Sequence, residues 1–245
     1  MSEDYSYIGV GQMYLRKRSG TTGLMPVGNV AELSFSPQEE TQTLPDYTQP
    51  GGGTRNERRR ITSVEVAMLM HDFSPENLSM AMFGATTNVA GGTATDESVT
   101  AKVGAIVPLA NAGATSVTVT SDPAGTTYVD GTDYEVKGAG IFIPEGSSIS
   151  ADDPLLVSYT YPEQDLVQAL VNSPEEYELL FDGVNEARSG KEAVVRAWRV
   201  KFGSAESLDL IGTEYGGLQI TGNALIDTSI VGTDISKYFK AAIVA

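Results

Sequence analysis

Residues 63–70 read SVEVAMLM, and they decide the fold class because apolar side chains occupy every second position. Consecutive side chains point to opposite faces of a β-strand, so positions 64, 66, 68 and 70 would form one apolar face. Ser63, Glu65 and Ala67 would lie on the other face. This alternation predicts a half-buried β-strand.

Three other segments show the same alternation, which makes the chain mainly β. Their apolar positions are Ala31, Leu33 and Phe35 in the first, Trp198, Val200 and Phe202 in the second, and Leu218 and Ile220 in the third. In the second segment, arginine and lysine would occupy the outer face. Neither flank of the chain has enough strands to enclose a core alone. We therefore expect residues 1–95 and 163–245 to pair into one discontinuous β domain.

The middle of the chain differs in charge and in local pattern. Residues 96–186 contain two lysines against 16 acidic residues, a net charge of −14, whereas residues 1–95 carry −3 and residues 187–245 carry +1. An uncharged run at 84–95, GATTNVAGGTAT, has the composition of a linker. Short apolar runs and turn residues then recur every 8 to 12 residues or so, which is typical of a small sandwich or barrel. We expect a small all-β domain inserted at 96–162.

The composition of the 245-residue chain excludes several classes of protein. Its net charge is −16 and its pI is near 4.3, so it should repel free DNA and anionic membranes. Cysteine is absent and histidine occurs once, which excludes disulfide scaffolds, thiol nucleophiles and multi-histidine metal sites. No apolar run approaches the ~20 residues of a spanning helix, and the N-terminus lacks a secretory signal. We therefore expect that the chain does not insert into membranes. We also expect that it is synthesised in a cytoplasm-like compartment.

One α-helix is well marked after residue 73. Ser74 suits the N-cap, Pro75 the first helical position, and Glu76 the positive end of the helix dipole. Gly84 is placed to end the helix. The face that covers a sheet would consist of Leu78, Met82 and Phe83.

The least regular stretch is 37–60, PQEETQTLPDYTQPGGGTRNERRR, which has three prolines, three consecutive glycines and no period. A structureless connection of this length is usually a binding loop or a segment that orders on a partner. Its charges are sorted along the chain, so the acidic part of one copy would meet the basic part of another. The residues predicted to make these contacts are Glu39, Glu40, Asp46, Arg55, Arg58, Arg59 and Arg60. The alternative is a flexible, solvated loop.

Few residues are suited to catalysis or to metal binding. His71 precedes Asp72, but neighbours in a strand point to opposite faces, which is poor geometry for a dyad and favours a structural or surface histidine. Two carboxylate pairs leave a glycosidase or a calcium site open, although both fall at turns, where Asp bonds the backbone. These pairs are Asp130 with Asp133 and Asp152 with Asp153. We expect no enzymatic activity and no cofactor.

Several motifs in the two flanks are shared with one family of viral proteins. They are 8–14 (IGVGQMY), 26–30 (PVGNV), the long loop before a strand and the 74–77 (SPEN) helix, 177–185 (YELLFDGVN), 208–217 (LDLIGTEYGG), 220–225 (ITGNAL) and 236–240 (SKYFK). In combination they resemble the major tail tube proteins of long-tailed, non-contractile bacteriophages. The resemblance covers residues 1 to about 84 and about 163 to 245, and the inserted domain is a departure from it.

This resemblance implies a β-sandwich with a flanking helix, in which the inner sheets of six copies join edge to edge around a channel. Stacked rings would form the tail tube for genome delivery, and the segment at 37–60 would order on stacking. The partners would be further copies of the chain, a tape measure protein, and tail terminator and tail tip proteins, with transient, non-specific passage of double-stranded DNA. The protein would be assembled in the host cytoplasm and would end in the virion tail, with the inserted domain outside the tube.

An acidic bore would repel phosphate and let the duplex slide. Because −14 of the net charge lies at 96–186, much of it in a domain expected outside the tube, few acids remain as channel-facing candidates: Glu32, Glu65, Glu178 and Asp182. The alternative function is a surface β-sandwich binding module, either an adhesin or a carbohydrate-binding domain. The acidic inserted domain supports that alternative, and the missing secretory signal counts against it. An enzyme that uses paired carboxylates is a third reading and would need two acids that converge in a cleft.

Overall fold

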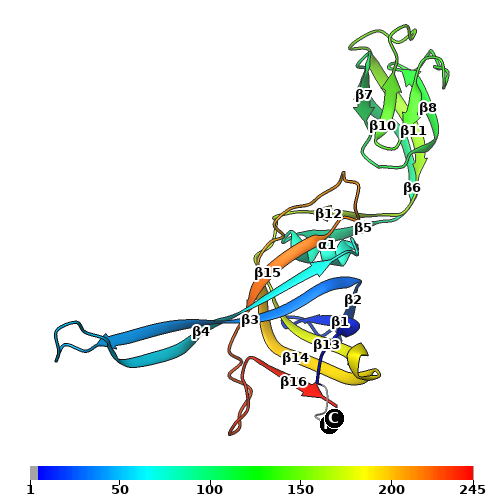
Figure 1. The fold of residues 1–245 in the computed structure, drawn as a ribbon. Coiled ribbons are helices and arrows are strands. Elements are labelled where there is room, and N and C mark those ends of the chain that lie inside the picture. The colour runs from blue at the N-terminus through cyan, green and yellow to red at the C-terminus, as the bar shows by residue number, and fades with distance from the viewer. Residues whose placement is uncertain (1–4, 245) are drawn as a thin grey trace. The chain divides into compact units, whose positions relative to one another are not determined.

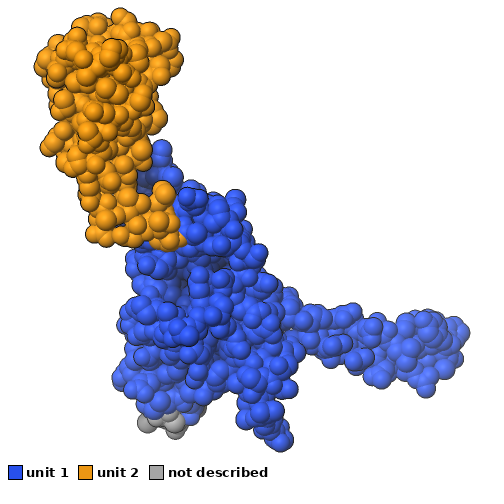
Figure 2. All heavy atoms as spheres, turned by 180° about the vertical axis from the view of Figure 1, so that it is seen from behind, with its two compact units in different colours: residues 1–85, 167–245 blue, residues 86–166 orange. Residues whose placement is uncertain are grey.

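The computed structural model describes residues 5–244 and confirms a mainly β fold with one α-helix (Figure 1). The chain forms two compact units, which Figure 2 shows in different colours. Unit 1 comprises residues 1–85 and 167–245, and unit 2 comprises residues 86–166. The sequence placed these divisions at 95/96 and 162/163, so unit 2 begins and ends outside the expected insertion.

Unit 1 is built on one antiparallel sheet to which both flanks contribute. Its strands are β1 (Gly9–Lys17), β2 (Met25–Gly28), β3 (Val30–Pro45), β4 (Thr54–Met70), β13 (Glu176–Asn185), β14 (Lys191–Phe202), β15 (Leu218–Ala224) and β16 (Phe239–Ile243). The order is β2-β1-β13-β14-β15-β4-β3, and β16 also pairs with β14. A short 3₁₀ helix, η1 (Glu186–Arg188), connects β13 to β14. Because β1 pairs with β13 and β4 with β15, the two flanks complete one sheet across the insertion.

The sheet of unit 1 folds over on itself around a single apolar core. Strand β14 contributes to both layers. Its residues 193–197 pair with β16 in one layer, and its residues 200–202 pair with β15 in the other. The layers meet where the rings of Phe35 in β3 and Phe239 in β16 stack, with centroids 4.9 Å apart. The core side chains include Met13, Val66, Met68, Met70, Tyr177, Leu179, Phe202, Leu218 and Ile220. The alternation at 63–70 is therefore confirmed, because Val64, Val66, Met68 and Met70 are all buried.

A β-bulge changes the inward face of β14. Tyr177 stands opposite Val200 and Leu179 opposite Ala197, so Trp198 and Arg199 together face the single residue Glu178. Ala197 is buried, whereas Trp198 is only half-buried. The expected inward position of Trp198 was wrong, because a strict period of two residues does not anticipate a bulge.

Helix α1 (Pro75–Ala81) begins as the capping signals predict. The Ser74 side chain accepts a hydrogen bond from the Asn77 backbone N–H at 3.1 Å, and Pro75 lies in the first turn. The predicted face was partly wrong, because the helix ends at Ala81, and Met82 and Phe83 lie at its C-cap and beyond it. Its buried residues are Asn77 and Ala81, and Leu78 and Met80 pack against the core.

Unit 2 consists of two three-stranded sheets around its own core. One contains β6 (Gly92–Thr100), β11 (Pro154–Tyr161) and β8 (Thr115–Ser121), and the other contains β7 (Ala105–Pro108), β10 (Gly140–Ile143) and β9 (Glu135–Lys137). Strands β5 (Ala85–Val89) and β12 (Gln164–Gln168) pair with each other where the chain enters and leaves this unit. Residues 84–95 were expected to be a linker and instead form β5 and the start of β6. Four of these twelve residues are threonine, which favours strands and outweighed the three glycines.

Candidate assembly surfaces

The stretch expected to be a structureless loop is a two-stranded ribbon. Strands β3 and β4 remain paired from Val30 opposite Met70 to Pro45 opposite Thr54, and residues 36–45 and 54–62 are all exposed. The prolines of this stretch are tolerated because β3 is the last strand of the sheet and Pro is confined to such edges. We call residues 37–62 the arm, which extends from the body of unit 1 in Figure 1.

The arm is long and has little apolar support. At 3.3 Å per residue, residues 38–45 span about 26 Å. A two-stranded ribbon is only marginally stable by itself in water, because it has no apolar face to bury. Its order therefore depends on the sheet at its base and on any surface that its tip contacts.

The charges of the arm are balanced within one hairpin. Glu40 lies opposite Arg60, Thr41 opposite Arg59 and Gln42 opposite Arg58, and Arg59 also forms an ion pair with Glu57. The arm contains four acidic residues and four arginines. The sorting seen in the sequence thus places acids and bases on facing strands of the same copy. Of the other residues predicted to make contacts, Glu39 lies opposite Ile61, and Arg55 follows Thr54 at the start of β4.

Asp46 has a structural role in the turn of the arm. Its carboxylate accepts hydrogen bonds from the hydroxyl and the backbone N–H of Thr48, at 2.6 and 2.9 Å, and these bonds lower its pKa. Its own N–H donates to the carbonyl oxygen of Gly53 at 2.7 Å. Gly51 and Gly52 have φ of 100° and 59°, a conformation that favours glycine and explains part of the glycine run.

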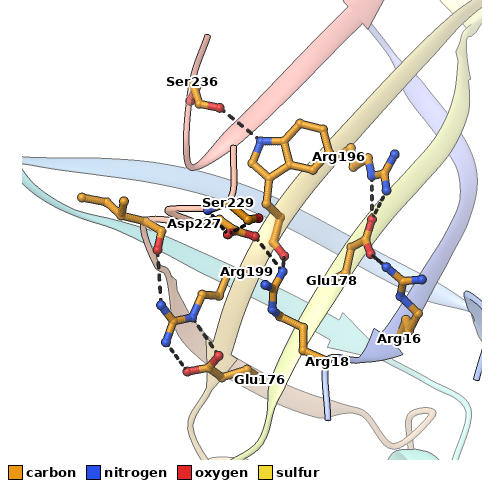
Figure 3. Close-up of polar contacts among 11 residues, drawn as sticks. Arg16, Arg18, Glu176, Glu178, Arg196, Arg199, Asp227, Ser229 and Ser236 are labelled. Atoms are coloured by element: carbon orange, nitrogen blue, oxygen red, sulfur yellow. Dashed lines mark hydrogen bonds and ion pairs between the residues drawn. The ribbon is translucent and has the colours of Figure 1, made fainter. Parts of the chain in front are cut away.

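A network of arginines and acids covers the outer face of β1, β13 and β14 (Figure 3). Glu178 lies at its centre with 1% of its surface exposed, and it forms ion pairs with Arg16 and Arg196. The Nε of Arg196 lies 2.6 Å from Glu178 Oε1. The three residues come from three neighbouring strands, so the carboxylate joins β1 to β14 across β13. The guanidinium of Arg196 also lies over the Trp198 ring, 4.8 Å from its centroid.

Two further ion pairs extend this network. Arg199 binds both carboxylate oxygens of Glu176, at 2.7 and 2.6 Å, and these hydrogen bonds hold the Glu176 pKa below its usual value. Arg18 lies 2.8 Å from Asp227 and donates to the Trp198 carbonyl oxygen. Hydrogen bonds from Ser229, and then the charge of Arg18, lower the Asp227 pKa. The network therefore ties the connection between β15 and β16 to the sheet.

The four acids predicted to face a channel do not share one surface. Glu178 is buried and ion-paired, so it is no free carboxylate. Asp182 is exposed farther along the outer face of β13. Glu65 alternates with the buried Val64 and Val66, and Glu32 lies opposite Leu69, which places both acids on the outer face of the other layer. One bore could not be lined by all four.

The core of unit 1 opens at one end into an apolar groove of about 710 Å³. Its walls come from β1, β3, β14 and β16, and they include Gly11, Phe35, Ala193, Ala241 and Ile243. Gly11 pairs directly with Gly183, and a Cβ at Gly11 would overlap the Gly183 backbone, so this close strand approach requires glycine. We call this hollow the β1–β16 groove. Sequence reasoning missed it because its walls come from segments more than 200 residues apart.

His71 has a structural role, the role that its sequence context favours. Its Nδ1 lies 2.9 Å from the carbonyl oxygen of Gly216, in the connection from β14 to β15. The other end of that connection is also held, because the Ala205 N–H donates to the Ala81 carbonyl oxygen at 2.7 Å. The histidine thereby fixes a loop that carries several exposed apolar residues.

Two of the four carboxylates considered for calcium or catalysis, Asp133 and Asp153, bond their own turns. Asp133 accepts hydrogen bonds from Val129 and Ser148, which lower its pKa, and Asp153 accepts one from the Ser150 N–H at 2.9 Å. Asp152 forms an ion pair with Lys102. Among residues 5–244, no group of three or more His, Cys, Asp or Glu is placed to hold a metal ion. In the same range, no helix is long and apolar enough to cross a membrane.

The chain belongs to a protein family described as "Protein of unknown function UCP028589", whose model matches residues 6–242. The match extends over both units, so unit 2 lies within the region that the family model spans. A search of the curated proteins found no match.

Proposed function

We propose that the protein is a structural subunit that polymerises as stacked rings of six copies into the tube of a phage tail for genome delivery. The observation that carries this proposal is the arm, an exposed ribbon of about 26 Å that has no apolar face of its own. Such a segment gains order when a second molecule covers it. In self-assembly the second molecule is another copy of the same chain, so no other partner is needed to order the arm.

The edges of the sheet support ring formation. Strands β2 and β3 end the order of the sheet, and among residues 5–244 β16 pairs only with β14. Natural proteins cover such edges or use them, because unpaired backbone groups invite another strand. Copies joined edge to edge by one repeated rotation would close into a ring.

The charge balance on the outer face of β1, β13, β14 and β16 supports a bore that binds DNA weakly. If this layer lined the channel, its bases and acids would nearly balance: Arg16, Arg196, Arg199, Lys201 and Lys240 against Glu176, Glu178, Asp182 and Glu192. A wall with so little excess positive charge would release few counterions and would hold the phosphate backbone loosely. This replaces the uniformly acidic bore expected from the sequence.

The remaining parts of the proposal follow from the tube. Its partners would be further copies, a tape measure protein, and tail terminator and tail tip proteins, with double-stranded DNA passing transiently. The chain would act in the virion tail after assembly in the host cytoplasm, without catalysis. Unit 2 would lie outside the tube, where its net charge of −9 would favour solubility.

Electron microscopy of concentrated protein, with and without tail tip complexes, tests this function. We expect rings or tubes with a central channel. A chain that stays monomeric at high concentration and forms no tubes on tail tip complexes would refute the proposal, and binding to glycans instead would favour a surface binding module.

As a second test, residues 86–166 are replaced by a short Gly-Ser linker. Tubes should still form, since both cores are separate.

A further inference from the structure

Three apolar side chains lie almost entirely in solvent in the loop between β14 and β15. Leu210, Ile211 and Tyr215 are 78%, 98% and 95% exposed. The loop is held at both ends, by the hydrogen bond from Ala205 to Ala81 and by the contact of His71 with Gly216. An exposed apolar cluster on a fixed support is characteristic of an interaction surface. We call residues 207–215 the apolar loop.

The apolar loop and the β1–β16 groove lie at opposite ends of the same strand. Ala193, near the start of β14, lines the groove, and Phe202 ends β14 just before the loop. These two residues are nine positions apart, which corresponds to about 30 Å along a strand. Another wall residue of the groove, Asn29, lies nearer the base of the loop, because its carbonyl oxygen accepts a hydrogen bond from His71, which contacts Gly216. The loop does not occupy the groove of its own chain, since Leu210 and Ile211 remain 78% and 98% exposed.

We propose that the apolar loop of one copy inserts Leu210 and Ile211 into the β1–β16 groove of a second copy. The contact joins two different surfaces, so each copy keeps one free groove and one free loop, and the association continues head to tail. The inference rests on the proposed function, because the contact would lie at the junction between stacked rings. Two rings would then be joined by the apolar loop in the groove as well as by the charged arm.

The small area that this contact would bury favours a second copy within a multivalent assembly over a single separate partner. Three side chains bury a few hundred Å², with up to roughly 250 Å² from a tyrosine, well below the ~1,200 Å² of a stable complex. A single loop in a single groove would therefore bind weakly. Two rings present several loops to several grooves at once, and linked contacts bind far more tightly than one.

The arm is the competing occupant of the groove. Its tip carries Leu44 and Tyr47, which are 52% and 83% exposed. The apolar loop is favoured because Leu210 and Ile211 are adjacent and 78% and 98% exposed, whereas Leu44 is 52% exposed and is separated from Tyr47 by Pro45 and Asp46. The arm in the groove is one outcome of the test below.

Cysteine cross-linking tests the contact directly, because the chain has no cysteine of its own. Ile211→Cys and an affinity-tagged Ala241→Cys are prepared separately, mixed, assembled and treated with a mild oxidant. A disulfide needs Cα atoms within about 7 Å, so we expect a tagged–untagged dimer only when the loop occupies the groove. Val231→Cys is the matched control, since Val231 is also 81% exposed but lies in another loop. It should form at least tenfold less of the mixed dimer.

Cross-linking of Tyr47→Cys to Ala241→Cys, without cross-linking of Ile211→Cys, would overturn the inference and assign the groove to the arm. Tubes of normal length in which neither pair cross-links would also overturn it, while leaving the proposed function intact. If the wild-type chain forms no tubes, the proposed function fails separately.

A second variant, Ala241→Trp, fills the groove from an exposed position. It should stop growth beyond single rings, and tubes of normal length from this variant would contradict the inference.

Discussion

Replacement of Glu178 by glutamine keeps the size of the side chain and removes the charge that Arg16 and Arg196 share. In the native protein, this carboxylate is almost fully buried and accepts bonds from strands on both sides of β13. Glutamine can accept one of these bonds but offers its amide group to the other arginine. Two cations would then face each other across β13 without an anion between them.

The magnitude follows from the burial of the partners. Breaking a buried ion pair by removing one partner costs about 3–5 kcal/mol. Here the side chains of Arg16 and Arg196 remain 42% and 39% exposed, so water solvates part of their charge and lowers the cost. We expect Glu178→Gln to lower the free energy of unfolding of unit 1 by about 2–3 kcal/mol. For a unit of this size, that corresponds to a fall in Tm of about 5–10 °C.

Differential scanning calorimetry measures this loss, and unit 2 serves as an internal reference because its core is separate. Only the transition of unit 1 should move. The matched control is Asp182→Asn, the same kind of change on the same strand at an exposed position, which should cost less than about 0.5 kcal/mol. Equal effects of the two variants, or a shift of the unit 2 transition, would refute this account of the network.

Three further changes test other parts of the structure. Ser74→Ala removes the N-cap of α1 and should cost about 1 kcal/mol in urea unfolding, whereas Ser74→Asp should retain most of the stability. Burial raises the pKa of Tyr177 to about 12. The unfolded chain ionises at lower pH, so the calorimetric transition of unit 1 should shift to lower temperature as pH rises from about 10 to 12. Tyr177→Phe should reduce that shift, whereas the transition of unit 2, which contains Tyr134 and Tyr159 with pKa values also raised by burial, should respond as in the native chain. Changing Arg58, Arg59 and Arg60 to Glu takes the net charge of the arm from zero to −6; tubes should be lost while the circular dichroism of the monomer is retained, and unchanged tubes would exclude the arm from stacking.

Local patterns in the sequence predicted the elements that depend on local signals. The alternation at Val64, Val66 and Met68 located β4, and the capping residues located the start of α1. The arm was missed because its order comes from pairing of β3 with β4, and its prolines and glycines were interpreted as breaks. Trp198 was placed on the wrong face because a bulge depends on the partner strand, which the local period does not describe.

The surfaces were harder to predict than the strands, since they combine distant residues. Glu178 alternates with apolar residues and therefore resembled an exposed acid. It is buried because Arg16 and Arg196 come from the strands on either side, and 162 positions separate Arg16 from Glu178. The motif at 208–217 contributes to the family resemblance, but its local pattern does not indicate that Leu210, Ile211 and Tyr215 are almost fully exposed.

The salt dependence of assembly would distinguish the two proposed kinds of stacking contact. A ring of six copies would carry six times −16, or −96, so the copies repel one another at low ionic strength. Salt shortens the range of that repulsion to about 8 Å at 0.15 M and leaves burial of Leu210 and Ile211 unaffected. If the apolar loop dominates, the critical concentration for tubes should fall as NaCl rises from 0.05 to 0.5 M. If ion pairs between arms dominate, the same salt should weaken them and the critical concentration should rise. Light scattering over this range gives the sign, and a rise would assign stacking mainly to the charges of the arm.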